Sequence, residues 1–243
     1  MQARIEFPQW ARQLASDHTD MDRAPRAVDA SKVSSVTLTL PDDVYYEYAF
    51  IDDEGRMRAD PLNELRAANP WYPEVSAIVG PEFRPSPYAS LDDSLAKGEL
   101  DRHRLESETL GSVRRLNVYT PAGQEGRSLP LLLVHDGTAF MRIGGLANVL
   151  EALLGEGRVR PVRLAFIEPA DRFSEYAFDE PYARFSMEEL LPFVENEYPS
   201  SGERLLMGAS LGGLMSATLA LGEPGHFLFL CRLIRAQTEF SAF

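Results

Sequence analysis

Two kinds of hydrophobic pattern divide the chain. Between residues 33 and 79, apolar and polar residues alternate in short runs, and Tyr46, Tyr48 and Phe50 fall on one face of such a run. Alternation with a period of two is typical of half-buried strands. From about residue 101 onward, continuous apolar runs of strand length alternate with segments of helical spacing. This second pattern predicts a parallel sheet with helices on both faces.

The first pattern predicts a small antiparallel, sandwich-like β domain at residues 1–81. Its strands are expected at residues 36–40, 44–51, 56–59 and 75–79. Before them, Phe7, Trp10 and Leu14 have the spacing of one helix face, which predicts a short packing helix. Residues 82–100 contain Pro and a polar Ser/Asp stretch, and they are assigned to a linker.

The second pattern places an α/β domain at residues 101–243. Its strands are expected at residues 105–110, 113–120, 131–134, 162–167 and 205–207. A stripe of Leu and Val predicts a helix around 146–154, and an Ala/Leu/Met-rich run predicts another from 211 to about 221. Ser186-Met187-Glu188-Glu189 has the form of a capping box, which predicts that a helix begins at Ser186.

A sharp turn is expected between the last of these strands and the helix at 211–221. Its sequence is Gly208-Ala209-Ser210-Leu211-Gly212-Gly213, a G-x-S-x-G motif in a strand–turn–helix context. Small residues are needed there because a β-carbon at Gly208 or Gly212 would strike the adjacent strand or helix. Ser210 then lies at a helix N-terminus, where free N–H groups favour a developing anion. We expect Ser210 to be a catalytic nucleophile; the alternative is a Gly-rich turn with a bystander serine.

Acyl transfer at Ser210 needs two backbone N–H donors for the oxyanion. One is expected from Leu211, the residue after the nucleophile. The other is expected from Thr138, in the loop after the buried strand at 131–134, where Gly137 lets the backbone turn sharply. The substrate-pocket candidates of this loop are His135, Asp136 and Gly137.

Several motifs, in order along the chain, resemble a known family. Val134-His135-Asp136-Gly137 together with the motif around Ser210 is similar to the putative esterase (esterase D-like) family of the α/β-hydrolase superfamily, which includes the enterochelin, or ferric siderophore, esterases. The strand at 46–52 followed by Asp60-Pro61-Leu62-Asn63 resembles the N-terminal β domain of those esterases. The likeness covers residues 33–227.

The resemblance implies further site residues in the loop after the strand at 162–167. In the family this loop carries an Arg and an acidic residue near the substrate, and the segment 171–176 stands there in this chain. Arg172, Glu175 and Tyr176 are therefore implied as pocket candidates that either touch the substrate or brace the pocket. The alternative is a surface ion pair between Arg172 and Glu175.

The triad of this fold follows the chain order Ser, acid, His, and that order does not continue after Ser210. No Asp follows it, and Glu223 precedes the one remaining histidine, His226, which lies beyond the helix and too far from the hydroxyl. His135 is expected to be scaffold rather than a substitute base. We expect the residues after about Phe227 to be an out-of-frame or truncated tail. The chain would then be inactive as given, and an unpaired sheet edge would favour self-association.

Charge and composition narrow the classes of partner. The formal net charge of −13 at pH 7 argues against nucleic acid or an anionic membrane surface. A single cysteine and four scattered histidines give no reason to expect a disulfide or a metal site. No apolar run approaches membrane-spanning length, and the first residues lack the apolar core of a signal peptide. We expect a cytoplasmic protein with no cofactor.

Two functions are left open. The first is a serine ester hydrolase that acts through Ser210 on a small-molecule ester, which the resemblance implies to be of the siderophore type. The second is a non-catalytic binding or scaffold protein, because the β domain resembles modules that bind glucans in other proteins. Tyr45, Trp71 and Tyr72 would then be sugar platforms. The other interpretation of these rings is packing against the α/β domain.

Overall fold

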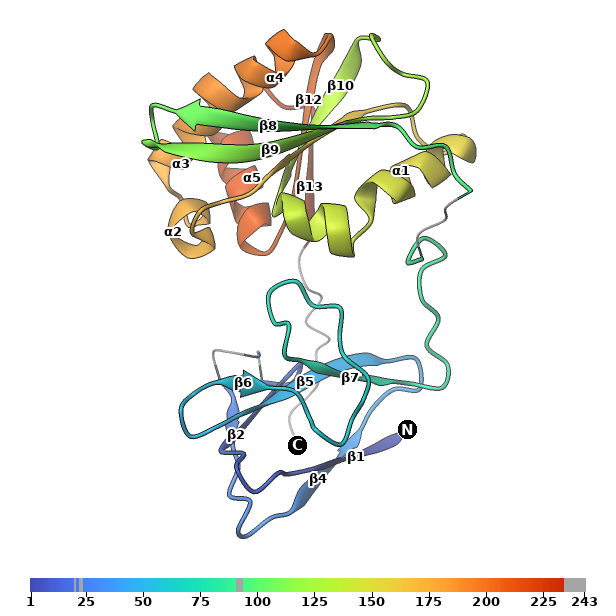
Figure 1. Cartoon of the computed structure of the whole chain (residues 1–243), viewed down its shortest axis with the longest axis vertical. Coiled ribbons are helices and arrows are strands. Elements are labelled where there is room, and N and C mark those ends of the chain that lie inside the picture. Colours follow the sequence, from blue (N-terminus) through green and yellow to red (C-terminus); the bar gives the residue numbers. More distant parts are fainter. Residues whose placement is uncertain (20, 22–23, 91–93, 234–243) are drawn as a thin grey trace. The chain divides into compact units, whose positions relative to one another are not determined.

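The computed structural model describes residues 1–19, 21, 24–90 and 94–233, and it separates the chain into two compact units (Figure 1). The first unit is Met1–Pro87 and the second is Tyr88–Phe243. The first consists of antiparallel strands, and the second alternates strands with helices. Both predicted classes of architecture are therefore confirmed.

The N-terminal unit contains two antiparallel sheets (Figure 1). In one, β1 (Gln2–Glu6) pairs with β4 (Ser35–Thr39). The other has the order β3-β2-β5-β6, and β7 also pairs with β5. Its strands are β2 (Gln13–Ser16), β3 (Arg26–Ala27), β5 (Tyr45–Ile51), β6 (Met57–Arg58) and β7 (Ser76–Val79).

The core of this unit forms around one face of β5. Tyr46, Tyr48 and Phe50 are all buried in it, as the alternation predicts. The helix predicted from Phe7, Trp10 and Leu14 is wrong, because a turn joins β1 to β2 at this point. Phe7 and Trp10 instead pack edge-on against Phe50, with ring centroids 6.1 and 5.9 Å away. Both rings pack against the same residue, and a turn can bring residues with this spacing to one partner as well as a helix can.

The C-terminal unit is built on a six-stranded sheet with the order β13-β12-β10-β11-β9-β8. Its four parallel strands are β10 (Leu129–His135), β11 (Arg163–Ile167), β12 (Ser200–Ala209) and β13 (Phe229–Leu233). The antiparallel hairpin of β8 (Glu99–Ser107) and β9 (Ser112–Thr120) extends the sheet beside β11. The parallel strands β10 and β11 are apolar along most of their length because both of their faces are covered.

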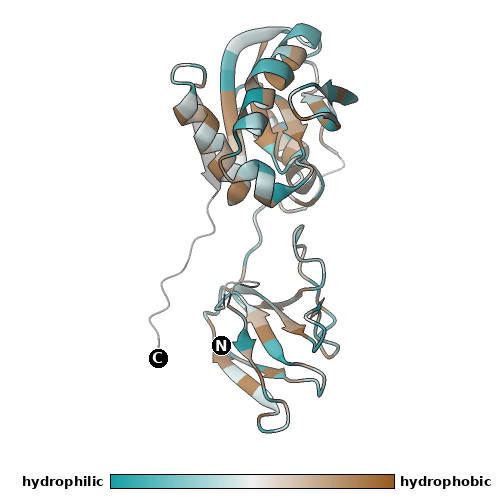
Figure 2. Cartoon of the chain, turned by 90° about the vertical axis from the view of Figure 1, so that its left-hand side faces the viewer, coloured by the Kyte–Doolittle hydropathy of each residue, from teal (hydrophilic) through white to brown (hydrophobic). Residues whose placement is uncertain are grey.

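Helices cover both faces of this sheet. One face packs against α4 (Leu191–Glu197) and α5 (Leu211–Gly222), and the other against α1 (Leu146–Gly155). The shorter helical segments are η1 (Ala139–Ile143), α2 (Arg172–Tyr176), α3 (Glu180–Arg184) and η2 (Phe185–Leu190). In Figure 2 the strands inside this unit are mostly brown, whereas the helices mix brown and teal segments, as expected for amphipathic layers over a buried sheet.

The helix predicted to begin at Ser186 begins earlier. Asp179 caps α3 by accepting the Tyr182 N–H at 2.9 Å, and Pro181 occupies the first turn. Ser186 lies inside the helical run that follows, where its hydroxyl donates to the Tyr182 carbonyl at 2.9 Å. The capping-box prediction is therefore wrong, because a serine within a helix can bond to the preceding turn instead of capping.

Candidate functional site: a strained serine at the carboxyl edge of the sheet

Ser210 lies between the end of β12 and the start of α5, at an exposed position. Its backbone angles are φ 50° and ψ −114°, a conformation that non-glycine residues rarely adopt. Such strain persists only where the surrounding structure holds it, and it is concentrated at functional sites. The strand–turn–helix context and this conformation together are the geometry of a nucleophile elbow.

The glycines around Ser210 are required by close packing. A β-carbon on Gly208 would overlap the backbone carbonyl group of Gly212 at the start of α5. A β-carbon on Gly212 would lie 2.5 Å from Oδ2 of Asp136 and 3.2 Å from Cβ of His135. The prediction that neither position can carry a β-carbon is confirmed. The first turn of α5 therefore lies directly against the loop after β10.

Leu211 is the first residue of α5, so its backbone N–H has no intrahelical acceptor. Thr138 is exposed in the loop after β10, and its N–H donates to Oε2 of Glu168 at 2.6 Å. Glu168 directly follows β11, whose end is in register with the end of β10. Sequence reasoning did not single out Glu168. The only available signal was its place at the carboxyl end of a central parallel strand, where ligand sites form.

The loop after β10 is held in an unusual conformation. Asp136 has φ 58°, and its N–H donates to the hydroxyl of Tyr176 at 3.0 Å. A β-carbon on Gly137 would lie 2.7 Å from the carbonyl carbon of Phe166 in β11. The loop thus passes so close to β11 that only glycine fits at this position.

Arg172 connects this loop to the elbow. Its Nε and Nη2 donate to Oδ1 and Oδ2 of Asp136 at 2.7 and 3.0 Å, and Nη2 also donates to the carbonyl of Ala209 at 2.9 Å. Asp136 is buried, and burial raises the pKa of its carboxyl while Arg172 opposes that rise. Arg172 thus links the loop after β10 to the end of β12, and Glu175 is paired with Arg114 rather than with Arg172.

Glu175 pairs with a different arginine. Its carboxylate accepts from Arg114 at 2.6 and 3.1 Å, and both side chains are largely buried. It also accepts the N–H of Ala170 at 2.8 Å. Glu175 therefore anchors α2 and the preceding loop to β9. Arg172 and Tyr176 therefore contact the loop after β10, whereas Glu175 does not contact it in the hydrogen bonds described above.

His135 is fully buried, and its Nδ1 lies 2.9 Å from the hydroxyl of Ser216 in α5. Its ring packs against the rings of Tyr176 and Tyr182. Burial lowers the pKa of His135 to about 3, so the imidazole is neutral at ordinary pH. The contacts of His135 are those of a core residue that joins β10 to α5.

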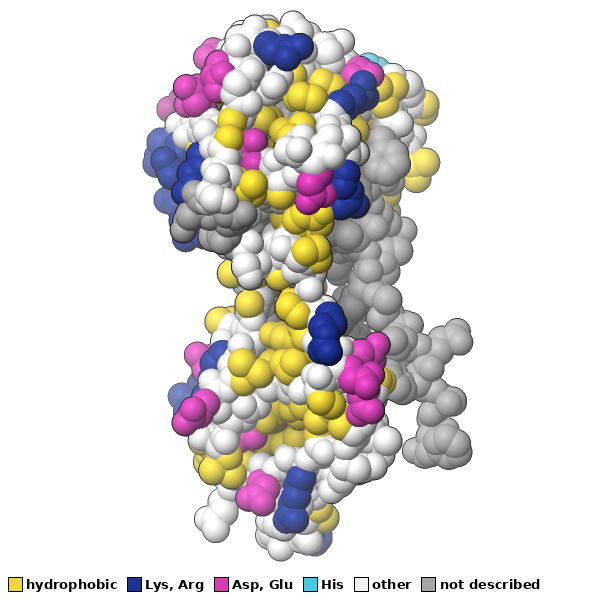
Figure 3. Space-filling model, turned by 90° about the vertical axis from the view of Figure 1, so that its right-hand side faces the viewer, with side chains coloured by type: hydrophobic (Ala, Val, Ile, Leu, Met, Phe, Trp, Pro, Cys, Tyr) yellow, Lys and Arg dark blue, Asp and Glu magenta, His cyan; other side chains and the backbone are white. Residues whose placement is uncertain are grey.

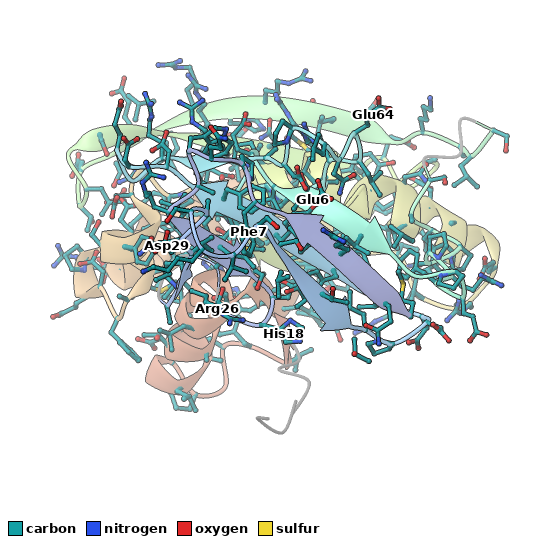
Figure 4. All side chains as sticks on the ribbon, turned by 90° about the horizontal axis from the view of Figure 1, so that it is seen from below. Glu6, Phe7, His18, Arg26, Asp29 and Glu64 are labelled. Carbon is teal, nitrogen blue, oxygen red and sulfur yellow. The ribbon has the colours of Figure 1, made fainter. Side chains whose placement is uncertain are left out.

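The other histidines have their own surroundings. His18, labelled in Figure 4, belongs to the N-terminal unit and lies 2.8 Å from the Tyr46 hydroxyl. His103 contacts the hydroxyl of Tyr198, and His226 is exposed beside Glu223. Among the described residues, no histidine is hydrogen-bonded to Ser210.

The described part of the chain contains no group of three or more His, Cys, Asp or Glu side chains that could hold a metal ion. Within the same residues, no helix combines the length and the apolar character that crossing a bilayer requires.

The strand order of the sheet and the strand–turn–helix elbow around Ser210 are those of the α/β-hydrolase fold. The model of the family described as "Putative esterase" matches residues 107–232, more than half of the chain, so the chain belongs to this family. We expected the family pattern to stop at about Phe227. That boundary is corrected, because the match reaches residue 232 and β13 pairs in parallel with β12. Residues 234–243, the rest of the expected tail, lie outside the described residues.

One similar protein is the uncharacterized protein YjcH of Bacillus subtilis (strain 168), which is 26% identical over 141 residues. The matched region spans 54% of this chain and 59% of that protein. Enterobactin esterase of Shigella flexneri, solved in the presence of enterobactin, superposes with a TM-score of 0.70 at 22% identity, covering 95% of this chain and 70% of that one. Ferric enterobactin esterase of Salmonella typhimurium gives 0.71 at 20% identity, covering 96% and 70%. At these identities the likeness shows the fold.

Proposed function

We propose that this protein is a serine ester hydrolase of the enterochelin esterase-like type. The observation that carries the proposal is the strained backbone of Ser210, exposed at the carboxyl end of a central parallel strand. The positive φ of Ser210 is stabilised by close packing that requires glycine at positions 208 and 212. The surrounding structure therefore holds the serine in this one conformation. A serine without a function in an ordinary turn would need neither the strained backbone nor the close packing around it.

In the proposed reaction, the Ser210 oxygen adds to the ester carbonyl and gives up its proton, and the carbonyl oxygen becomes an oxyanion. Collapse of this adduct breaks the ester C–O bond, and the alcohol leaves with that proton. Water then hydrolyses the acyl-serine, which releases the carboxylic acid and restores the Ser210 hydroxyl. The N–H groups of Leu211 and Thr138 would stabilise the oxyanion, together with the dipole of α5. Removing one such donor typically slows acyl transfer by about a hundredfold or more. Arg172 would act as a positioning residue, because it binds the carbonyl of Ala209 beside the nucleophile.

Efficient turnover also needs a base for the serine proton and an acid that orients the base. Residues 211–243 do not supply them in the order that this fold uses. We therefore propose that the 243-residue polypeptide acylates slowly at Ser210 and turns over poorly.

The proposed substrate class is a small-molecule ester of the siderophore type. Support comes from the overall fold, which superposes on an enterobactin esterase solved with enterobactin over nearly the whole of this chain. The cytoplasmic location expected from the sequence is compatible with this class. Self-association through the edge of the sheet is proposed as well, and size-exclusion chromatography of the full chain tests it.

The test of the function is covalent labelling. The full chain is incubated with a fluorophosphonate probe or p-nitrophenyl acetate, and the adduct is located by peptide mass spectrometry. We expect one adduct on Ser210 that is lost in Ser210→Ala and kept in Ser201→Ala, a matched change at an exposed serine of β12. No adduct on Ser210, or an equal adduct in Ser210→Ala, would overturn the proposal.

A second candidate is the binding-scaffold function. The favouring observation is the exposure of Trp71 and Tyr45, at 42% and 37%; Tyr72 is less available because it packs against the buried cluster that contains Val75. Figure 3 shows hydrophobic side chains exposed on one face of the N-terminal unit. Glucan binding by a Ser210→Ala protein, lost on Trp71→Ala, together with no labelling of the parent chain, would favour this function.

A further inference from the structure

The N–H expected to bind the oxyanion is already engaged. Oε2 of Glu168 accepts it at 2.6 Å. The two residues are 30 positions apart in sequence and meet because β10 and β11 end side by side, with His135 and Ile167 in register. A carboxylate oxygen therefore occupies the acceptor position of this N–H.

The position of this carboxylate is set by its neighbours. The close approach of Gly137 to β11 keeps the loop near the strand end from which Glu168 emerges. The charged groups that face Glu168 are Asp136 and Arg172, which act in opposite directions on its pKa. Partial burial is the larger influence and raises the pKa of Glu168, and the hydrogen bonds from Thr138 counteract it.

We propose that Glu168 is a positioning residue that competes with the substrate for the Thr138 N–H. In the resting site its carboxylate orients this donor and keeps it from other acceptors. A bound ester must displace it, because one N–H cannot be well aligned with both oxygens. The negative charge also opposes a second anion at the same donor, so displacement is hardest for an anionic tetrahedral adduct. This inference rests on the proposed hydrolase function.

Phenylboronic acid provides the probe. The Ser210 oxygen adds to the trigonal boron, a B–O bond forms, the serine proton leaves to solvent, and the product is a tetrahedral boronate anion that mimics the adduct of ester attack. Its affinity is measured by calorimetry on the full chain. Replacing Glu168 by Gln keeps the shape but removes the charge, and we expect about tenfold tighter binding, the equivalent of one charge-assisted hydrogen bond released.

Two variants make the result specific. Glu108→Gln, at an exposed site of the same unit, should bind the boronate like the parent chain. Ser210→Ala should abolish adduct formation. Equal affinity of Glu168→Gln and the parent, with loss in Ser210→Ala, would overturn the competition and leave the hydrolase proposal standing. Undiminished binding in Ser210→Ala would overturn both.

A second measurement needs no substitution at Glu168. In the parent chain, the amide proton of Thr138 should shift with pH as Glu168 titrates, because the carboxylate is its acceptor. Saturation with phenylboronic acid should remove that titration and move the Glu168 carboxyl carbon resonance. A Thr138 amide that follows Glu168 equally with and without boronate contradicts the proposal, even if the Gln variant does not fold.

Discussion

Arg172 binds the carbonyl oxygen of Ala209, the residue directly before the strained serine, at 2.9 Å. The same guanidinium pairs with Asp136 through two hydrogen bonds. One side chain from α2 thus connects the end of the nucleophile strand β12 to the loop after β10. The elbow and the expected oxyanion loop are held as one assembly by a residue that is distant from both in sequence.

Arg172→Met should destabilise the C-terminal unit by about 3 kcal/mol, because it leaves the buried carboxylate of Asp136 without its partner. It should also slow labelling of Ser210. Urea unfolding and fluorophosphonate labelling measure the two effects. The double variant Arg172→Met/Asp136→Asn removes the unpaired charge and should recover much of the stability but not the labelling rate. Unfolding of Arg172→Met at the parent's urea concentration would contradict the bracing role.

Ser210→Gly should be more stable than Ser210→Ala by about 1 kcal/mol. Glycine adopts φ 50° and ψ −114° without the clash that any β-carbon meets there, whereas alanine retains it. Both variants lose the nucleophile, so the comparison isolates the strain. Thermal unfolding of the two proteins side by side measures the difference. Equal stability would mean that the serine conformation is not strained in solution.

Gly212→Ala should destabilise the C-terminal unit by about 2 kcal/mol, because the new β-carbon would lie 2.5 Å from Oδ2 of Asp136. Gly222→Ala is the matched control at the other end of α5, where a β-carbon meets nothing within 4 Å. It should leave stability unchanged or raise it by up to about 1 kcal/mol, since alanine favours helix. Urea denaturation of both variants checks the prediction. A Gly212→Ala protein with the free energy of unfolding of the parent chain would refute the close contact.

His135 should make folding stability fall as the pH falls. Its folded-state pKa of about 3 lies below the unfolded value of about 6.5. The unfolded chain therefore binds a proton first, and stability drops by up to about 1.4 kcal/mol per pH unit below pH 6.5. His135→Gln should lose that part of the slope between pH 6.5 and 5. His226→Gln, at an exposed site, should keep it. Parallel slopes for His135→Gln and the parent would show that the histidine is not buried in the neutral form.

Tyr48→Phe should destabilise the N-terminal unit by about 2 kcal/mol. The Tyr48 hydroxyl donates to Oδ2 of Asp60 at 2.6 Å in a buried site, and it accepts from Asn63 at 3.2 Å. Removal leaves the Asp60 oxygen without this donor. Tyr45→Phe, on the exposed side of the same strand, should have little effect. The comparison, by thermal unfolding, tests whether the Asp60–Asn63 turn is fixed to β5 by one hydroxyl.

Much of the fold could be predicted from local sequence. The buried strands, the helix after the elbow and the need for glycine at 208 and 212 follow from hydrophobic period and backbone sterics, which act within a few residues. Two of the errors in the fold arose where a local pattern is compatible with two structures. Phe7 and Trp10 fit a turn that packs on Phe50, and Ser186 fits the interior of a helix that Asp179 caps.

The candidate site also has one part that local sequence predicts and another that it does not. Sequence alone determined that Ser210 lies in a sharp strand-to-helix turn, because glycine, serine and helix-forming residues specify that turn locally. Only the tertiary structure decided that Arg172 pairs with Asp136, 36 residues away, and that Glu168 holds the N–H of Thr138, 30 residues away. The physical reason is that adjacent parallel strands bring their carboxyl ends to one edge of the sheet, so side chains meet there according to strand order, which no short stretch of sequence contains.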